Sequence, residues 1–297
     1  MGIDAKCLVF LSKISNKNPL GRCITLGRQQ LFIEPHLLSW ASKTSGVPKN
    51  ELETWNGQFA EEFLMRYFGA SEVVSLDVFP NDQPTLLHDM NMPIPQKLEG
   101  GFDAVLDIGT SEHIFSSVTV FENVKNLCKK DGFIVHYVPG NNMCGHGLYQ
   151  FSPTLFQSIY YSEFKHGYGN IYLNFQNDER AFFKLSFDER ERINICFGGR
   201  MNQFVFVRNN GKSEGVCEVQ QMDYLVQAGA SQQPVFAGGV RSFLKKIRFL
   251  RVSISYLRST RIYASMREAY LFRRYSERID ISNEVFRSAL VEEVSSV

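Results

Sequence analysis

The chain has 297 residues, of which 44% are hydrophobic and 21% are charged. This composition excludes a disordered or fibrous chain and is that of a globular protein with a sizeable core. The net charge of +1 hides an asymmetry, because residues 241–278 hold eleven Lys and Arg against two Glu, or +9, which leaves −8 for the rest. The basic segment therefore predicts a surface for anionic partners, whereas the main body shows no general affinity for polyanions.

The six cysteines are scattered, without a Cys-x-x-Cys pair or a histidine at the spacing of zinc ligands. We expect reduced, structural thiols. The N-terminal segment has no signal-peptide cleavage site, and no run of apolar residues is long enough to span a membrane. The sequence thus predicts a cytoplasmic protein.

From residue 22 to residue 138, short apolar runs alternate with stretches of helical period, which indicates strands joined by helices in a largely parallel sheet. The expected strands are 22–27, 73–77, 85–89, 102–108, 133–138, 171–175 and 203–207. The expected helices are 35–42, 51–68, 115–128, one that begins at Ser152-Pro153 and a long amphipathic one from Ser242. We therefore predict an α/β fold, with a doubly wound, mostly parallel, Rossmann-like sheet of seven strands over residues 1–240. A basic helical extension is expected over residues 241–297.

Ligands of open parallel sheets bind beyond the carboxyl ends of the strands, so the residues there matter most. Asp77 ends the second strand, where its carboxylate can accept hydrogen bonds from ribose hydroxyls, and Asp89 ends the third, where it can accept from an adenine amine. Gly27 ends the first strand and lets the backbone approach a ligand. The alternative is that both aspartates only cap turns.

This order of strand ends, followed by Phe102-Asp-Ala-Val-Leu-Asp-Ile-Gly-Thr-Ser-Glu-His113, resembles class I S-adenosylmethionine-dependent methyltransferases. Further motifs from Ser75 to Pro153 resemble a bacterial subgroup associated with glycan modification, and the resemblance covers roughly residues 20–175. It implies S-adenosylmethionine as the cofactor. The residues expected to bind it are Gly27, Arg28, Gln29, Asp77, Asp89, Met90, Gly109 and Glu112. The chain departs from the family at Gly27-Arg-Gln-Gln30, which has one glycine where a Gly-x-Gly loop is usual.

Three side chains are candidates for catalysis because they follow strands at the same edge. His113 can act as a general base, and His146 lies in a glycine-flanked loop with Tyr149 two residues past Gly147. Structural roles for Glu112 and His113 stay open, and His136, in the middle of an apolar run, is expected in the core.

The sequence thus predicts methyl transfer to an oxygen, or less readily a nitrogen, of a carbohydrate or small-molecule acceptor. Direct displacement at a sulfonium needs no metal, so none is expected. The alternatives are a catalytically inactive scaffold subunit with this fold and, less favoured, a nucleic-acid methyltransferase. Residues 241–278 predict peripheral attachment to an anionic membrane surface, against the alternative of a solvated helix packed on the domain, and oligomerisation stays open.

Overall fold

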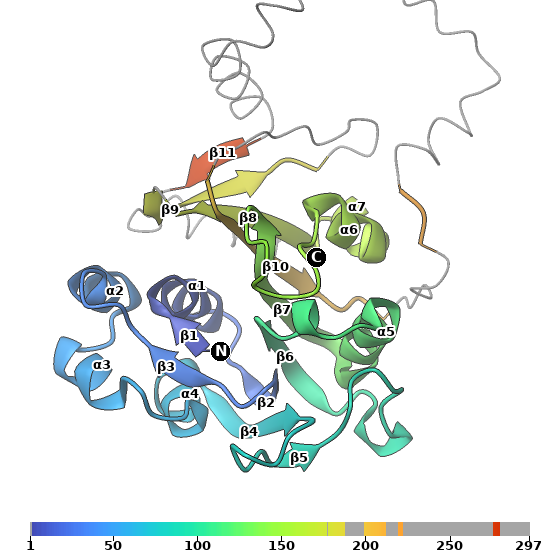
Figure 1. The fold of residues 1–297 in the computed structure, drawn as a ribbon, viewed down its shortest axis with the longest axis horizontal. Coiled ribbons are helices and arrows are strands. Elements are labelled where there is room, and N and C mark those ends of the chain that lie inside the picture. Colours follow the sequence, from blue (N-terminus) through green and yellow to red (C-terminus); the bar gives the residue numbers. More distant parts are fainter. Residues whose placement is uncertain (1, 177, 188–198, 212–218, 222–275, 280–297) are drawn as a thin grey trace, which may run out of the picture.

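The computed structural model describes residues 2–176, 178–187, 199–211, 219–221 and 276–279, and its ribbon is drawn in Figure 1. The strands of the main sheet are β2 Gly21–Leu26, β4 Ala70–Asp77, β5 Leu86–Leu87, β6 Phe102–Ile108, β7 Cys128–Asn141, β8 Gly169–Phe175, β9 Asp178–Leu185, β10 Met201–Arg208 and β11 Ser276–Ile279. They lie in the order β11-β9-β8-β10-β7-β6-β2-β4-β5. Neighbours from β5 to β7 pair in parallel, and neighbours from β7 to β11 pair antiparallel.

The parallel part of the sheet has the order of a doubly wound fold. Numbered along the chain, β5-β4-β2-β6-β7 are the third, second, first, fourth and fifth strands of the sheet. In this arrangement the strand order reverses between the first and the fourth strand, and a crevice opens there beyond the carboxyl ends. That position lies between β2 and β6.

The helices cover both faces of this sheet (Figure 1). They are α1 Ala5–Ser15, α2 Leu38–Ser45, α3 Lys49–Trp55, α4 Glu61–Phe68, α5 Ser117–Leu127, α6 Pro153–Ile159 and α7 Tyr161–Lys165, with 3-10 turns η1 Gln96–Leu98 and η2 Ser111–His113. Two short strands, β1 Gly2–Asp4 and β3 Gln30–Phe32, pair in parallel as a separate small sheet.

The core has two parts because successive strand residues point to opposite faces. In β6, Leu106 belongs to the cluster under α1, whereas Val105 belongs to the cluster under α5. On the first face Phe10 of α1 packs its ring 4.6 Å from that of Phe204. The apolar side chains of the central strands are thus buried from both sides, which is typical of parallel strands covered by helices.

The predicted α/β, doubly wound sheet is confirmed, and each of its seven expected strands is present. The described sheet has nine strands, because β9 and β11 extend its antiparallel edge. β11 lies in the segment expected to be helical, so these four residues are a strand instead. The boundary at residue 240, the helix from Ser242 and most of the basic segment 241–278 lie outside the described residues. No helix in the described ranges could cross a membrane.

One helix was not predicted, and one helix prediction needs correction. The N-terminal segment, for which no secondary structure was predicted, forms the buried helix α1. The single helix expected over 51–68 is two, α3 and α4, because the segment between them pairs with the edge of β3. Asn56 exchanges side-chain hydrogen bonds with the backbone of Ile33, and Leu31 exchanges backbone bonds with Gly57 and Gln58.

Candidate active site

The crevice at the point where the strand order reverses gathers polar side chains around Gly27. Gly27 follows β2 with φ of 73°, and its N–H donates to the carbonyl of Leu76 in β4. A Cβ there would lie 3.2 Å from Thr110 Oγ1 and 3.9 Å from Asp77 Oδ2. The structure therefore brings the ends of β2, β4 and β6 together around Gly27, where a side chain would be tightly packed and the backbone conformation favours glycine.

Asp77, at the end of β4, offers one carboxylate oxygen to a ligand. Its Oδ1 accepts a hydrogen bond from the Phe79 N–H at 3.0 Å, which fixes the side chain. Within the described part of the chain, Oδ2 has no hydrogen-bond partner, and the residue is half-buried. A fixed carboxylate with one unused oxygen can accept hydrogen bonds from hydroxyl groups.

The side chains of Arg28 and Gln29 are engaged inside the protein. Arg28 Nε lies 2.6 Å from Glu61 Oε1, its Nη1 donates to the carbonyl of Asp82, and its guanidinium stacks on Phe59. Gln29 is buried, and its Nε2 donates to the carbonyls of Leu26 and Gly27. The side-chain donors of Arg28 and Gln29, which we expected to bind the cofactor, thus stabilise the loops after β2 and β4 instead.

Asp89 and Met90, also expected at the cofactor site, differ in exposure. Asp89 is exposed, and hydrogen bonds from the backbone and side chain of Asn91 lower the pKa of its carboxyl. This is the turn-capping alternative raised above. Met90 is buried in the core, where the Asn123 amide donates to its carbonyl.

A cavity of about 240 Å³ opens next to this crevice, beyond the carboxyl ends of β6 and β7. Its lining residues are Gly2, Asp4, Ile108, Gly109, Glu112, Tyr137, Val138, Pro139, Met143, His146 and Asn202. Gly109 lines the cavity and precedes Thr110, which donates to the Leu26 carbonyl at 2.6 Å. The Gly27 crevice and the cavity are therefore neighbours, because the loop after β6 contacts the first through Thr110 and lines the second through Gly109.

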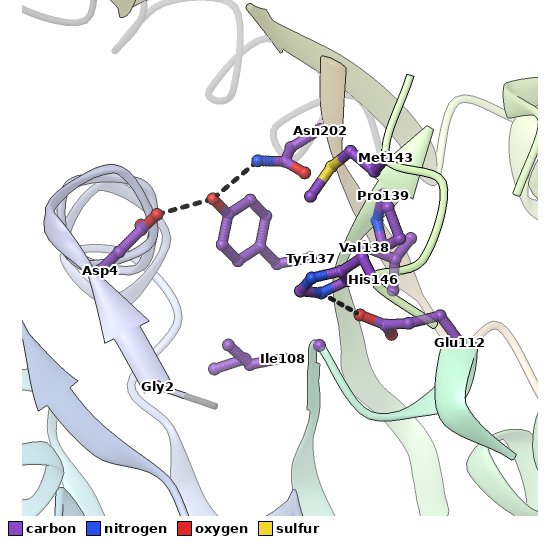
Figure 2. A pocket seen from close by; sticks show the side chains of 11 residues that line it. Gly2, Asp4, Ile108, Glu112, Tyr137, Val138, Pro139, Met143, His146 and Asn202 are labelled. Atoms are coloured by element: carbon purple, nitrogen blue, oxygen red, sulfur yellow. Dashed lines mark hydrogen bonds and ion pairs between the residues drawn. The ribbon is translucent and has the colours of Figure 1, made fainter. Parts of the chain in front are cut away.

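Glu112 is the most unusual residue of the cavity. Its side chain is 0% exposed, yet neither carboxyl oxygen has a hydrogen-bond partner among the described residues. Burial, followed by the nearby charge of Asp107, raises the pKa of Glu112 to about 8. Its Oε1 lies 3.4 Å from His146 Nε2 and 3.9 Å from His113 Nε2, as Figure 2 shows for His146. The structure thus brings together three predicted residues.

His146 reaches Glu112 because the loop after β7 is fastened to the Glu112 backbone. The N–H groups of Leu148 and Tyr149 both donate to the Glu112 carbonyl, at 2.8 and 3.1 Å. Gly147 lies so close that a Cβ there would be 2.9 Å from that same carbonyl oxygen. The Gly-His-Gly sequence therefore permits close contact between loop and turn, with His146 held at the cavity.

Tyr149 does not line the cavity, although we expected its phenol there. Its hydroxyl donates to the carbonyl of Phe115 at 2.7 Å, and its ring stacks on Phe151. The side chain thus anchors the far end of the loop. Tyr149 is therefore not among the residues that line the cavity with His146.

A buried chain of hydrogen bonds lies under the η2 turn. His136 joins Asp107 at 2.7 Å through Nδ1 and the Tyr160 hydroxyl at 2.8 Å through Nε2. The other oxygen of Asp107 accepts from the Ser111 N–H, next to Glu112. His136 is fully buried, as predicted, and this chain holds the turn that presents Glu112.

The opposite wall of the cavity has polar residues that the sequence analysis missed. Asn202 donates to the Tyr137 hydroxyl at 3.2 Å, and that hydroxyl donates to Asp4 Oδ2 at 2.7 Å (Figure 2). Asp4 also caps α1, so the unrecognised N-terminal helix is what brings it here. Tyr137 could have been found from its position near the end of the apolar run 133–138, two residues before Pro139, but Asp4 and Asn202 carry no such signal.

No family model and no curated protein matches this chain. Solved structures similar to it include the trans-methyltransferase CalH complexed with SAH (14% identity, 46% of this chain and 37% of that chain, TM-score 0.28). A second is the Burkholderia thailandensis 1,6-didemethyltoxoflavin-N1-methyltransferase with bound 1,6-didemethyltoxoflavin and S-adenosylhomocysteine (10% identity, 69% of this chain and 77% of that chain, TM-score 0.35). A third is the N-methyltransferase NodS from Bradyrhizobium japonicum WM9 (12% identity, 69% of this chain and 94% of that chain, TM-score 0.35). The chain thus spans little more than a third of the first of these. All three TM-scores lie below 0.5, so the fold is established by the strand order and pairing.

Proposed function

We propose that this protein transfers a methyl group from S-adenosylmethionine to a small acceptor. The observation that carries this proposal is the fixed Asp77 carboxylate, with one unused oxygen, beside the side-chain-free Gly27 where the strand order reverses. A nucleoside bound there would place its ribose hydroxyls on Asp77, and Gly27 would allow close approach of the backbone. Methyltransferases among the similar structures agree with this proposal.

The bound cofactor would supply a methyl group attached to a positively charged sulfur, and this sulfur is a good leaving group. The chain then has to align the acceptor and remove its proton. Glu112, His113 and His146 lie on the acceptor side. Glu112 and His113 follow the Gly109-Thr110 segment that borders the Gly27 crevice by two and three residues, and His146 comes from the loop after β7. This cluster is where the acceptor loses its proton.

The acceptor itself is small or presents one small part to the cavity. A volume of about 240 Å³ lies below the range of about 300–1,000 Å³ that holds drug-sized ligands. Asp4, Tyr137 and Asn202 line it with polar groups that suit hydroxyl-bearing molecules. We favour an oxygen acceptor on a carbohydrate or small molecule, and the glycan preference is supported only by the subgroup resemblance.

The test is calorimetric titration of the full chain with S-adenosylmethionine and with S-adenosylhomocysteine. Asp77→Ala should weaken both by about 10- to 100-fold, because hydrogen bonds to a charged group contribute about 1.5–3 kcal/mol. Asp82→Ala is the matched control, since Asp82 is an exposed loop residue whose backbone carbonyl, not its side chain, contacts Arg28. No binding of either compound to the unaltered protein would overturn the proposal.

A second candidate is a scaffold subunit that keeps the fold without the chemistry. It is favoured by Arg28 and Gln29, whose donors are bonded to the protein's own Glu61, Asp82 and Leu26. Such a protein would give no binding heat with S-adenosylmethionine or S-adenosylhomocysteine, and Asp77→Ala would not change this result. The titration therefore separates the two candidates.

A further inference from the structure

Glu112, His113 and His146 form a cluster whose geometry resembles that of metal ligands. One ligand atom from each residue lies within 4.8 Å of the other two. Ligands of a tetrahedral ion at about 2.1 Å are about 3.4 Å apart. The His146–Glu112 pair already has that separation, at 3.4 Å, and the other pairs are wider by at most about 1.4 Å. His113 and His146 have side chains 37% and 43% exposed, so they can rotate to close this difference.

Glu112 supplies an independent observation that points to a ligand. Buried polar groups in proteins are almost always hydrogen-bonded, and a buried carboxyl without a partner is costly. Both oxygens of Glu112 are buried and have no hydrogen-bond partner among the described residues. Within the same ranges, the ionisable side chains within 4.0 Å of its carboxyl oxygens are those of His113 and His146. A cation between the three residues would give this carboxylate its missing partner.

We propose that Glu112, His113 and His146 bind one divalent transition-metal ion at the edge of the cavity. Two imidazoles and one carboxylate are a ligand set that zinc, iron and manganese accept, whereas magnesium and calcium prefer oxygen ligands. Three protein ligands leave at least one coordination position open, as in catalytic rather than structural sites. Glu112 and His146 both line the cavity, so that position faces the space proposed for the acceptor.

The protein also provides the surroundings that a metal site needs. The Glu112 carbonyl is fixed by Leu148 and Tyr149, and the preceding Ser111 N–H is fixed by Asp107. Such outer contacts orient metal ligands.

The role of the ion rests on the proposed function, although its binding does not. An acceptor hydroxyl on the open position would lose its proton to solvent more easily, because a bound cation lowers the pKa of a coordinated oxygen. The oxygen then forms a bond to the methyl carbon, the carbon–sulfur bond breaks, and its electron pair stays on sulfur. This proposal departs from the expectation that the displacement needs no metal.

The test uses tag-free full chain, stripped with a chelator and titrated with Zn²⁺ by calorimetry and with Co²⁺ by visible absorption. We expect one ion per chain and a Co²⁺ spectrum stronger than that of the aqueous ion, with Mg²⁺ much weaker. His146→Ala, His113→Ala and Glu112→Gln should each weaken Zn²⁺ binding by at least about 100-fold. His166→Ala is the control, because His166 is exposed and bonds its own helix at Ser162.

His146→Ala keeps the test informative if Glu112→Gln fails to fold, since His146 is an exposed loop residue. No Zn²⁺ or Co²⁺ binding, or binding equal in all four variants, would overturn the metal site. S-adenosylmethionine titrated in parallel separates the two proposals. Cofactor binding without metal would refute only the metal site, and metal binding without the cofactor would refute only the methyl transfer.

Discussion

The two sides of the strand-end crevice are built differently. On the cofactor side, Asp77 is held by one backbone N–H and stays half-exposed, and its neighbours Arg28 and Gln29 are bonded within the protein. On the acceptor side, Glu112 is fully buried without a hydrogen bond, and His146 reaches it from a separate loop. On the cofactor side, the donors of Arg28 and Gln29 are therefore bonded within the protein, and Asp77 Oδ2 is left for a ligand. On the acceptor side, both oxygens of the buried Glu112 carboxyl lack a partner among the described residues, so we expect the chemistry to depend most on the acceptor side.

The largest effect expected from this difference is on turnover. His146→Ala should lower the rate of methyl transfer by about 100- to 10,000-fold, because the acceptor proton would lose its route off the oxygen. Affinity for S-adenosylmethionine should stay within about twofold, because the contacts of His146 among the described residues are with Met143, Glu112 and His113. Transfer of labelled methyl groups into small-molecule and glycan extracts measures the first, and calorimetry measures the second.

His166→Ala provides the matched control for this variant, with full turnover expected. Unchanged turnover in His146→Ala would remove this residue from the reaction. The contacts indicate that the cofactor side and the acceptor side are separate. A loss of cofactor affinity in His146→Ala, alongside the loss of turnover, would contradict this.

The cofactor side could be predicted from the sequence because strand ends are local signals. An apolar run that ends in Gly27 or Asp77 identifies both the strand and the residue at its edge, and β2 and β4 end there in the structure. The contacts of Arg28 could not be predicted, because its partners, Glu61 and Asp82, lie 33 and 54 residues away along the chain.

The acceptor side could be predicted only in part. Glu112 and His146 were visible as polar residues after strands, but the burial of Glu112 depends on Gly147, whose loop packs against it. Asp4 was missed because its helix has apolar residues on nearly every side and shows no amphipathic period. A helix that is buried on nearly every side depends on tertiary contacts, here with Phe204 and its neighbours, and these contacts are not visible in the sequence.

A smaller effect is expected from the buried hydrogen-bond chain that supports the acceptor side. Tyr160→Phe removes the hydroxyl that bonds His136 Nε2 and should lower the free energy of unfolding by about 1–2 kcal/mol, because a buried imidazole nitrogen loses its partner. Urea denaturation measures this. Tyr161→Phe, at a partly exposed neighbour, should change stability by less than about 0.5 kcal/mol.

Tyr160→Phe should lower turnover less than His146→Ala does. Among the described residues, the Tyr160 hydroxyl is linked to the η2 turn by hydrogen bonds through His136 and Asp107. Equal losses of turnover in the two variants, without a change in stability, would place the buried chain in the reaction itself.

The smallest effect is expected at Asp89, and it compares two aspartates at the ends of neighbouring strands. Asp77 is half-buried beside Gly27, whereas Asp89 is exposed and its Oδ1 is occupied by the Asn91 backbone and side chain. An exposed carboxylate gains little from a hydrogen bond to a ligand, because water competes for it. Asp89→Ala should therefore weaken S-adenosylmethionine binding by less than about threefold in the same titration that shows a 10- to 100-fold loss for Asp77→Ala. A loss as large as that of Asp77→Ala would mean that the cofactor spans both strand ends and shields Asp89 from water when bound.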